Sequence, residues 1–218
     1  MIDFERARRA MVDNQLRAGG VTERRLLAAM ASVPREIFLP ESRRAIAYVD
    51  DVHELGAPGS GRFLASPATF ARLVQLAEIA ETDRVLDVGT GTGYPAAVLA
   101  KLARSVTGLE ADPALAELAR ANLAALGIGN VEIVAGEAEA LPGGGYDAIV
   151  VEGSIPGEPG AFLPLLSPGG RLVAVVCEGG VGVARVYVRA ETGVASRLEF
   201  NAALPPLRRT PPRETFVF

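Results

Sequence analysis

From residue 84 onward, the chain alternates short apolar runs with segments whose apolar residues recur at helical spacing. This alternation is typical of βα units wound around a parallel sheet. Runs made almost entirely of Val, Leu and Ile indicate strands that are buried on both faces. We therefore expect an α/β fold with a doubly wound, mostly parallel sheet. The predicted strands cover 85–88, 106–109, 131–134, 148–151 and 171–176, and the predicted helices between them cover about 94–102 and 114–126.

The N-terminal third has a different pattern, which predicts helices ahead of the sheet. Asp3 is a favoured N-cap for a first helix, whose apolar residues recur near helical spacing, and Gly19-Gly20 allows a left-handed exit. A second helix follows, with Thr22 as its predicted cap. Pro34 forces this helix to stop, because proline cannot continue a helix interior.

Two further segments complete the outline of the chain. Residues 40–62 have no sustained period and are rich in Gly and Pro, so they are expected to form an irregular loop. Ser66 and Pro67 suit the cap and the first position of a third helix. In the tail, the segments 183–189 and 199–218 are expected to add antiparallel edge strands around a Pro-rich stretch.

Length and charge limit what the chain is expected to be and to bind. With 218 residues, 49% of them hydrophobic, it is long enough to bury one sizeable core, and we expect a single domain. Within it, 1–80 forms a helical segment and 81–218 the core. There are 22 Lys and Arg against 26 Asp and Glu, a net charge of -4, and no basic stripe follows the chain. A nucleic-acid partner is therefore not expected.

The scarcity of cysteine and histidine bears on metal binding and on the compartment. Cys177 and His53 are the single residues of their types, so neither an intramolecular disulfide nor a structural zinc site is expected. Cys177 is expected to act as a small apolar residue, and His53 to face solvent from its loop. No apolar run approaches the roughly 20 residues that span a bilayer. We expect a cytoplasmic protein with no membrane partner.

The sharpest local signal is the sequence VLDVGTGTGY at residues 85–94. Its glycines let the backbone turn sharply after a buried strand and approach a ligand with no Cβ in the way. A helix N-terminus follows, which presents free backbone N–H groups to a polar ligand. A dinucleotide fingerprint would need a small residue where Tyr94 stands. The residues assigned to this ligand are Asp87, Gly89, Thr90, Gly91 and Gly93, and a side chain added at Gly91 is expected to fill the ligand's place.

Glu110 indicates that the ligand is a nucleoside. It lies about twenty residues beyond Gly89, at the end of the second predicted strand, where a carboxylate accepts hydrogen bonds from both ribose hydroxyls. This role is common to NAD and S-adenosylmethionine. Gly136 and Glu137 follow the third strand and are assigned to the adenine, with a solvated turn as the alternative. Glu152, at the end of the fourth strand, is assigned a place near the sulfonium, with a simple turn as the alternative.

The G-x-G-x-G spacing after Asp87 resembles motif I of class I methyltransferases. Beyond it, the chain resembles the protein-L-isoaspartate O-methyltransferase family over roughly residues 10–180, and the N-terminal matches are the most particular to that family. The resemblance implies a Rossmann-like methyltransferase sheet. The matching segments are MVDNQLR at 11–17, AMASVP at 29–34, FLP at 38–40, AY at 47–48 with DD at 50–51, 85–99, 130–131, 146–151 and 166–173.

The resemblance implies transfer of a methyl group from S-adenosylmethionine to the free α-carboxyl of an isoaspartyl residue in damaged protein, with S-adenosylhomocysteine as the product. The partner is then a protein or peptide with a free carboxylate. A carboxylate with an ordinary pKa of about 4 is already ionised at neutral pH, so no general base is needed. Placing its oxygen in line with the sulfonium methyl in a dry pocket is then the main task of the site.

The chain departs from the family pattern just before the third helix. The family has G-x-T-[IV]-S-x-P there, and alignment on Pro67 places its threonine on Phe63 and its active-site serine on Ala65. Both hydroxyls are absent. The candidate catalytic residues are therefore Ser66, the neighbouring hydroxyl, and Arg62, a possible bidentate donor to a substrate carboxylate. Helix capping and a solvent-facing charge are the alternative roles of these two residues.

Three alternatives to isoaspartyl methylation follow from this departure. The first alternative is a divergent methyltransferase with another acceptor, and the second is a non-catalytic protein that binds S-adenosylmethionine. A nicotinamide-dependent oxidoreductase is a more distant alternative, which Tyr94 argues against.

Overall fold

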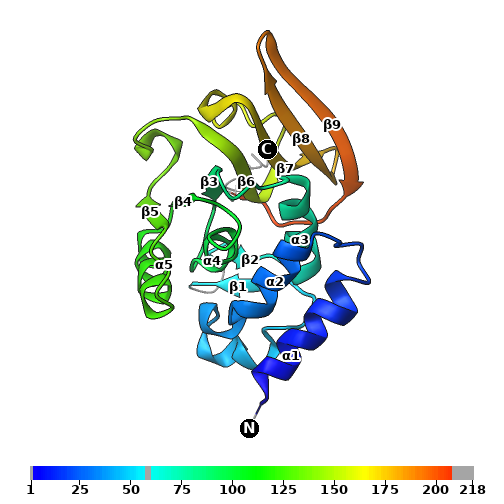
Figure 1. The fold of residues 1–218 in the computed structure, drawn as a ribbon, viewed down its shortest axis with the longest axis vertical. Coiled ribbons are helices and arrows are strands. Elements are labelled where there is room, and N and C mark those ends of the chain that lie inside the picture. Colours follow the sequence, from blue (N-terminus) through cyan, green and yellow to red (C-terminus); the bar gives the residue numbers. More distant parts are fainter. Residues whose placement is uncertain (1, 57–59, 208–218) are drawn as a thin grey trace, which may run out of the picture.

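The centre of the molecule is a seven-stranded sheet, seen in the computed structural model that describes residues 2–56 and 60–207 (Figure 1). Its strands lie in the order β5-β4-β3-β6-β7-β8-β9. They are β3 (Arg84–Val88), β4 (Ser105–Glu110), β5 (Val131–Ala135), β6 (Tyr146–Ile155), β7 (Leu166–Glu178), β8 (Val181–Ala190) and β9 (Gly193–Asn201).

The predicted doubly wound topology is confirmed. From β3 the chain moves outward through β4 and β5, returns to the other side of β3 as β6, and continues outward to β7. These five strands pair in parallel, and β8 and β9 add antiparallel pairs. The direction of winding reverses between β3 and β6, which is where open α/β sheets place their ligands.

The helices begin and end close to where the sequence predicts. Asp3 caps the first helix, because its carboxylate accepts a 2.9 Å hydrogen bond from the backbone N–H of Arg6. The prediction of Thr22 as the second cap is wrong. Glu23 takes that position, and its carboxylate accepts from the N–H groups of the first helical turn. The helices are α1 (Phe4–Met11), which continues as a π-helical turn, α2 (Arg24–Ser32), α3 (Pro67–Leu76), α4 (Tyr94–Leu99) and α5 (Pro113–Ala125).

The predicted loop at 40–62 contains regular structure that the sequence did not reveal. A 3-10 helix covers Glu41–Ile46, and β1 (His53–Leu55) pairs antiparallel with β2 (Arg62–Leu64). Strands of three residues are too short for an alternating pattern to be recognised, so the pairing is visible only in three dimensions.

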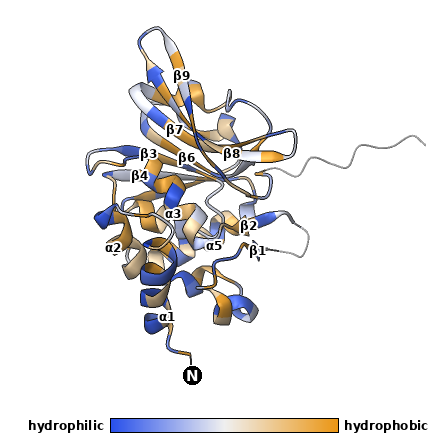
Figure 2. Ribbon diagram, turned by 90° about the vertical axis from the view of Figure 1, so that its right-hand side faces the viewer, coloured by the Kyte–Doolittle hydropathy of each residue, from blue (hydrophilic) through white to orange (hydrophobic). Residues whose placement is uncertain are grey.

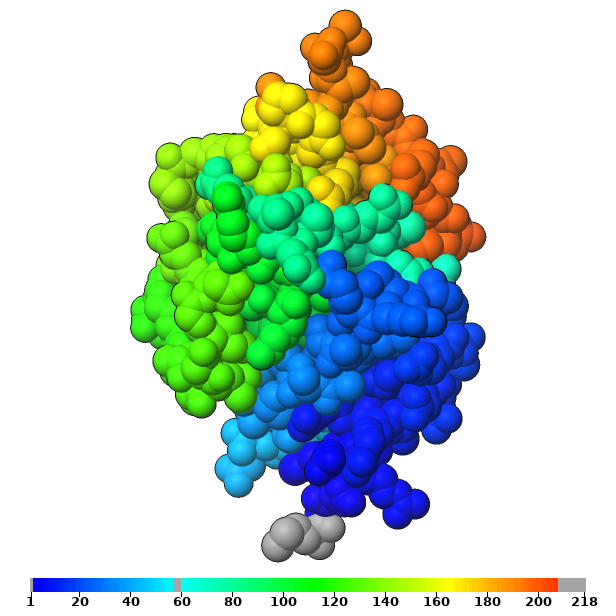
Figure 3. Space-filling model, in the orientation of Figure 1, coloured from blue at the N-terminus to red at the C-terminus, as the bar shows by residue number. Residues whose placement is uncertain are grey.

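The tail forms a hairpin rather than two separated strands. The first predicted segment lies within β8, as expected, but the second strand is β9, which starts several residues before the predicted 199. Most β9 side chains are exposed, so no apolar alternation marks this strand in the sequence. Residues 208–218 of the second predicted segment lie outside the described part of the chain. Figure 3 shows the hairpin in orange at the top of the molecule.

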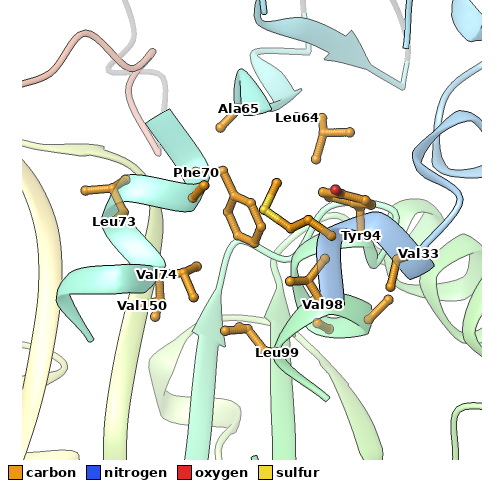
Figure 4. Packing of buried hydrophobic residues seen from close by; sticks show 14 of the residues in the cluster. Val33, Leu64, Ala65, Phe70, Leu73, Val74, Tyr94, Val98, Leu99 and Val150 are labelled. Carbon is orange, nitrogen blue, oxygen red and sulfur yellow. The ribbon is translucent and has the colours of Figure 1, made fainter. Parts of the chain in front are cut away.

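Two apolar clusters cover the two faces of the sheet. The larger one receives the buried side chains of all five α-helices named above, which lie together below the sheet in Figure 2. Figure 4 shows part of this cluster: Phe70 of α3 has the sheet residue Val150 on one side and Tyr94 of α4 on the other. The opposite face is covered by extended segments and two 3-10 turns, at Ala138–Ala140 and Leu163–Leu165. The N-terminal segment therefore shares its core with the sheet.

None of the helices in the described part of the chain combines the length and the apolar character that crossing a bilayer would require.

Candidate active site

The glycine loop makes the predicted bend at the carboxyl end of β3. Gly89, Gly91 and Gly93 have φ angles of 86°, 59° and 95°, a region that side chains other than glycine rarely adopt. At Gly93 a Cβ would lie 3.2 Å from the Cα of Ala119 in α5. Thr90 is buried. Its backbone N–H donates to the carbonyl oxygen of Leu109, and its own carbonyl oxygen accepts from the N–H of Gly93. The bend thus places backbone amides of the loop over the end of the sheet.

Glu110 lies beneath this loop, as predicted from its spacing. It ends β4 and is fully buried. Its Oε2 accepts a 2.7 Å hydrogen bond from the N–H of Gly91, and its Oε1 accepts a 3.0 Å bond from the N–H of Asp112. The carboxylate is therefore held against the loop, facing the space where a ribose is expected.

Two further buried carboxyl groups lie on the neighbouring strands β3 and β6, which pair directly. Asp87 is one residue before the end of β3, and Glu152 comes just after the last β6 residue that pairs with β3. Because β6 runs on to Ile155, Glu152 does not end its strand as the sequence predicted. Both oxygens of Asp87 and the Oε1 of Glu152 have no hydrogen-bond partner among the described residues. Burial raises the pKa of Asp87 to about 7, and the charge of Glu110 adds to this effect. Burial, and after it the charge of Asp87, raises the pKa of Glu152 well above its ordinary value.

These carboxyl groups are built to receive a cation. A buried carboxylate without a partner is costly unless a ligand supplies a positive charge or hydrogen-bond donors. The described residues contain no cluster of His, Cys, Asp and Glu side chains arranged to hold a metal ion. An organic cation such as an ammonium or sulfonium group would supply the missing positive charge to Asp87 and Glu152.

Gly136 and Glu137 lie where the sequence places them, at the rim of the same site. The N–H of Gly136 donates a 2.8 Å hydrogen bond to the carbonyl oxygen of Glu110. Both residues line a small cavity of about 20 Å³ next to Gly89, together with Arg62, Val88, Leu109, Ala111, Phe162 and Leu207.

Arg62 is neither solvent-facing nor isolated. Its Nη2 donates a 2.5 Å hydrogen bond to the Oε2 of Glu110, and its Nη1 donates a 3.0 Å bond to the carbonyl oxygen of Leu207. Arg62 and Leu207 also lie directly against Gly89. A Cβ at Gly89 would lie 2.6 Å from the Cδ1 of Leu207 and 3.3 Å from the Nη2 of Arg62.

The expectation for Gly91 needs correction. A Cβ there would lie 2.8 Å from the Cδ1 of Leu55 in β1, on the protein side of the loop. A branched side chain at Gly91 would therefore disturb the packing under the loop. At Gly89, by contrast, a Cβ would meet Leu207 and Arg62, which line the small cavity.

The segment before α3 presents one hydroxyl. Ser66 is nearly buried at the N-cap position, yet its Oγ donates a 3.1 Å hydrogen bond to the Oγ1 of Thr69 and caps no backbone N–H. Phe63 and Ala65, at the two positions where the family has hydroxyls, are buried in the apolar core. The carbonyl oxygen of Ala65 accepts a 2.5 Å hydrogen bond from Arg35.

Arg35 was not identified from the sequence, although it positions this segment. It is fully buried, donates a 2.9 Å hydrogen bond to the carbonyl oxygen of Ala47, and lies 4.8 Å from the ring centre of Tyr94. Burial lowers its pKa, although an arginine remains charged at any physiological pH. Tyr94 also packs edge to face against Phe38. Its large ring, which argued against a dinucleotide loop, joins the N-terminal segment to α4.

His53 is not solvent-facing, contrary to the expectation from its loop position. It is buried in β1, and its Nε2 has no hydrogen-bond partner among the described residues. Burial lowers the pKa of this imidazole, and the charge of Arg35 lowers it further. His53 is therefore a neutral core residue at physiological pH.

The comparisons with known proteins agree with this geometry. The sequence model of the protein-L-isoaspartate(D-aspartate) O-methyltransferase family matches residues 6–202. The chain belongs to this family. A protein-L-isoaspartate O-methyltransferase of Methanoculleus marisnigri is 41% identical over 78% of this chain and 77% of its own length. The corresponding enzyme 1 of Rhodopseudomonas palustris is 43% identical over 79% of this chain and 70% of its own.

Solved structures of the same description share the fold. One protein-L-isoaspartate O-methyltransferase has a TM-score of 0.79 at 24% identity; the alignment covers 91% of this chain and 65% of the longer one. A Plasmodium falciparum chain of the same description, solved in complex with S-adenosyl-L-homocysteine, has a TM-score of 0.77 at 22% identity over 93% of this chain. At these identities the structures support the Rossmann-like methyltransferase fold alone.

The first prediction concerns the cost of burying Asp87. Its folded pKa of about 7 exceeds the ordinary value of 3.8, so the folded state loses stability as pH rises from about 4 to 7. Asp87→Asn removes this loss. At pH 8 the ligand-free variant should melt roughly 5 °C above the wild type, and the difference should shrink toward pH 4. The exposed control Asp13→Asn should show no such trend, and equal melting curves for Asp87→Asn at pH 8 would contradict the assignment.

The second prediction concerns the pH dependence of binding. A ligand ammonium group placed beside Asp87 would pair with the ionised carboxylate, so its binding should release a proton below about pH 7. Calorimetric titration with S-adenosylhomocysteine should give affinities that rise from pH 6 to pH 8, by up to tenfold per unit below 7. Titrations in buffers of different ionisation enthalpy count the released protons. A dissociation constant that does not change over this range would refute the pairing.

Proposed function

We propose that this protein is an S-adenosylmethionine-dependent methyltransferase that methylates the α-carboxyl of isoaspartyl residues in damaged proteins or peptides. The proposal is supported by the family to which the chain belongs. The observation that carries it is the pair of buried, unpartnered carboxyl groups of Asp87 and Glu152 beside a bare glycine loop. A ligand that joins a nucleoside to a positively charged amino acid suits this site, because its ribose can bond Glu110 and its positive charge can pair with Asp87 and Glu152.

Each part of the site has a role in this proposal. The backbone at Gly89, Gly91 and Gly93 allows close approach of the ligand. Glu110 accepts hydrogen bonds from the ribose hydroxyls. S-adenosylmethionine supplies an electrophilic methyl group on a sulfonium. The negative charge of the site is contributed by Asp87 and Glu152, and Gly136 and Glu137 border the adenine.

On the acceptor side, the chain has to bind and orient a carboxylate that is already ionised. We assign this task to Arg62 and Ser66. Arg62 offers a planar pair of donors that matches a carboxylate. Ser66 is supported by its place next to Ala65, where the family has its active-site serine. A cytoplasmic location is also proposed, supported by the single cysteine, Cys177.

A second candidate function is methylation of a different acceptor with the same cofactor. The observation that favours it is the replacement of both family hydroxyls by Phe63 and Ala65, whose side chains are buried in the core. These two residues donate no side-chain hydrogen bond, so an acceptor that depends on such bonds loses them here.

The third prediction separates these functions. Purified protein incubated with labelled S-adenosylmethionine and an isoaspartyl peptide should form a base-labile methyl ester, and the matched aspartyl peptide should form none. Binding of S-adenosylhomocysteine without any methyl ester above an enzyme-free blank would favour the other acceptor. Absence of both binding and turnover would refute the proposal altogether.

The fourth prediction tests Ser66. If its hydroxyl contacts the acceptor, Ser66→Ala should lower kcat/KM for the isoaspartyl peptide about tenfold, the effect of one lost hydrogen bond, while the affinity for S-adenosylhomocysteine stays constant. Thr69→Ala is the matched control, because it removes the hydroxyl that Ser66 contacts and keeps Ser66 itself. A variant with unchanged kcat/KM and a lower melting temperature would show that Ser66 serves only the helix.

A further inference from the structure

One guanidinium group joins three separate parts of the chain at the nucleoside site. Arg62 comes from β2, Glu110 ends β4, and Leu207 lies beyond β9. The Nη2 of Arg62 bonds the Oε2 of Glu110 at 2.5 Å, and the Nη1 bonds the carbonyl oxygen of Leu207 at 3.0 Å. The Arg62 side chain is 13% exposed and that of Glu110 is fully buried, so this ion pair is shielded from water.

The segment that carries Leu207 is seated on β6 at the same point. The N–H of Ser154 donates to the carbonyl oxygen of Pro205 at 2.9 Å, and the N–H of Leu207 donates to that of Ser154 at 2.8 Å. Gly153 makes this close approach possible, because a Cβ there would lie 2.8 Å from the Cα of Leu207. The leucine side chain points to Gly89 and lines the cavity with Arg62.

Within the described part of the chain, the cavity that Arg62 and Leu207 line beside Gly89 is too small for the proposed ligand. The cavity of about 20 Å³ has room for roughly one water molecule. Sites for small organic ligands have volumes of about 300 Å³ or more. A nucleoside whose ribose bonds the Oε2 of Glu110 takes the place of the Arg62 guanidinium there. A nucleoside that enters the cavity beside Gly89 also displaces the Leu207 side chain, which lines that cavity.

We propose that Arg62 and Leu207 form a latch that occupies the nucleoside site and opens when ribose hydroxyls replace the guanidinium on Glu110. This inference rests on the proposed function for the identity of the ligand. The two residues move together, because the bond from Arg62 to the Leu207 carbonyl ties the guanidinium to the segment after β9. The family model ends at residue 202, so Leu207 lies outside the part of the chain that it matches.

The latch has a measurable consequence for affinity. A ligand that binds only the open state has its apparent affinity reduced by the fraction of molecules that are open. Removing Arg62 shifts the molecules toward the open state and leaves the buried carboxylate of Glu110 without its cation, so ribose hydroxyls gain more by binding it. Loss of Arg62 should therefore strengthen cofactor binding, whereas an arginine that contacts the cofactor would weaken it when lost.

The test compares S-adenosylhomocysteine binding, by calorimetry and stopped-flow fluorescence, in the wild type, Arg62→Ala and Arg104→Ala. Arg104 is an exposed arginine just before β4, at the opposite end of the strand from Glu110, so this control changes the net charge equally. Arg62→Ala should bind about tenfold tighter and associate faster than the wild type. Leu207→Ala, which leaves the ion pair in place, should also bind more tightly, and the control should match the wild type.

A second readout needs no ligand. Hydrogen exchange at the amides of Ser154 and Leu207 should be faster in Arg62→Ala than in the wild type, because the segment loses its bond to the guanidinium. Arg104→Ala should leave these amides unchanged.

The outcomes separate the latch from the function on which it rests. Wild type that binds S-adenosylhomocysteine, together with an Arg62→Ala variant that binds equally or more weakly, overturns the latch and leaves the proposed function standing. Absence of binding in every variant overturns the proposed ligand, and unchanged exchange at Ser154 and Leu207 then overturns the latch as well.

Discussion

Three carboxyl groups buried on the adjacent strands β3, β4 and β6 are the constraint on which the rest of this structure depends. Asp87, Glu110 and Glu152 lie there together, and only Glu110 has partners for both of its oxygens. A protein gains no stability from such an arrangement, since each unpartnered carboxylate weakens the fold as it ionises. The arrangement is consistent with a site that a cationic ligand completes.

The packing around the glycine loop holds these three carboxyl groups in a buried, fixed position. The N-terminal segment forms a common core with the sheet, and Tyr94 at the start of α4 contacts Phe38 and the guanidinium of Arg35. The hydroxyl of Thr92, within the glycine loop, donates a 2.6 Å hydrogen bond to the carbonyl oxygen of Phe38. The family-specific N-terminal sequence therefore supports the glycine loop and, through the bond from Arg35 to Ala65, the segment before α3.

Local patterns were sufficient to predict the parallel sheet, the glycine bend and the position of Glu110. Apolar runs indicate buried strands, glycines indicate positive φ angles, and the distance along the chain from Gly89 places Glu110. Arg62 is separated along the chain by 48 positions from Glu110 and by 145 positions from Leu207, so no local pattern contains these contacts. The burial of His53 was missed for a related reason, because the three-residue strand β1 has no recognisable period. Thr22 does not cap the second helix; its hydroxyl instead donates to the Oε1 of the distant Gln75, a contact that no local pattern contains.

The central claim is that the carboxyl groups and the glycine loop form one site for a positively charged nucleoside. A crystal structure of the protein with S-adenosylhomocysteine tests it most directly. The account predicts ribose hydroxyls on Glu110 and the ammonium group of the ligand within hydrogen-bond distance of Asp87 or Glu152. A ligand bound elsewhere, or one whose sugar points away from Glu110 while Asp87 stays without a partner, would contradict it.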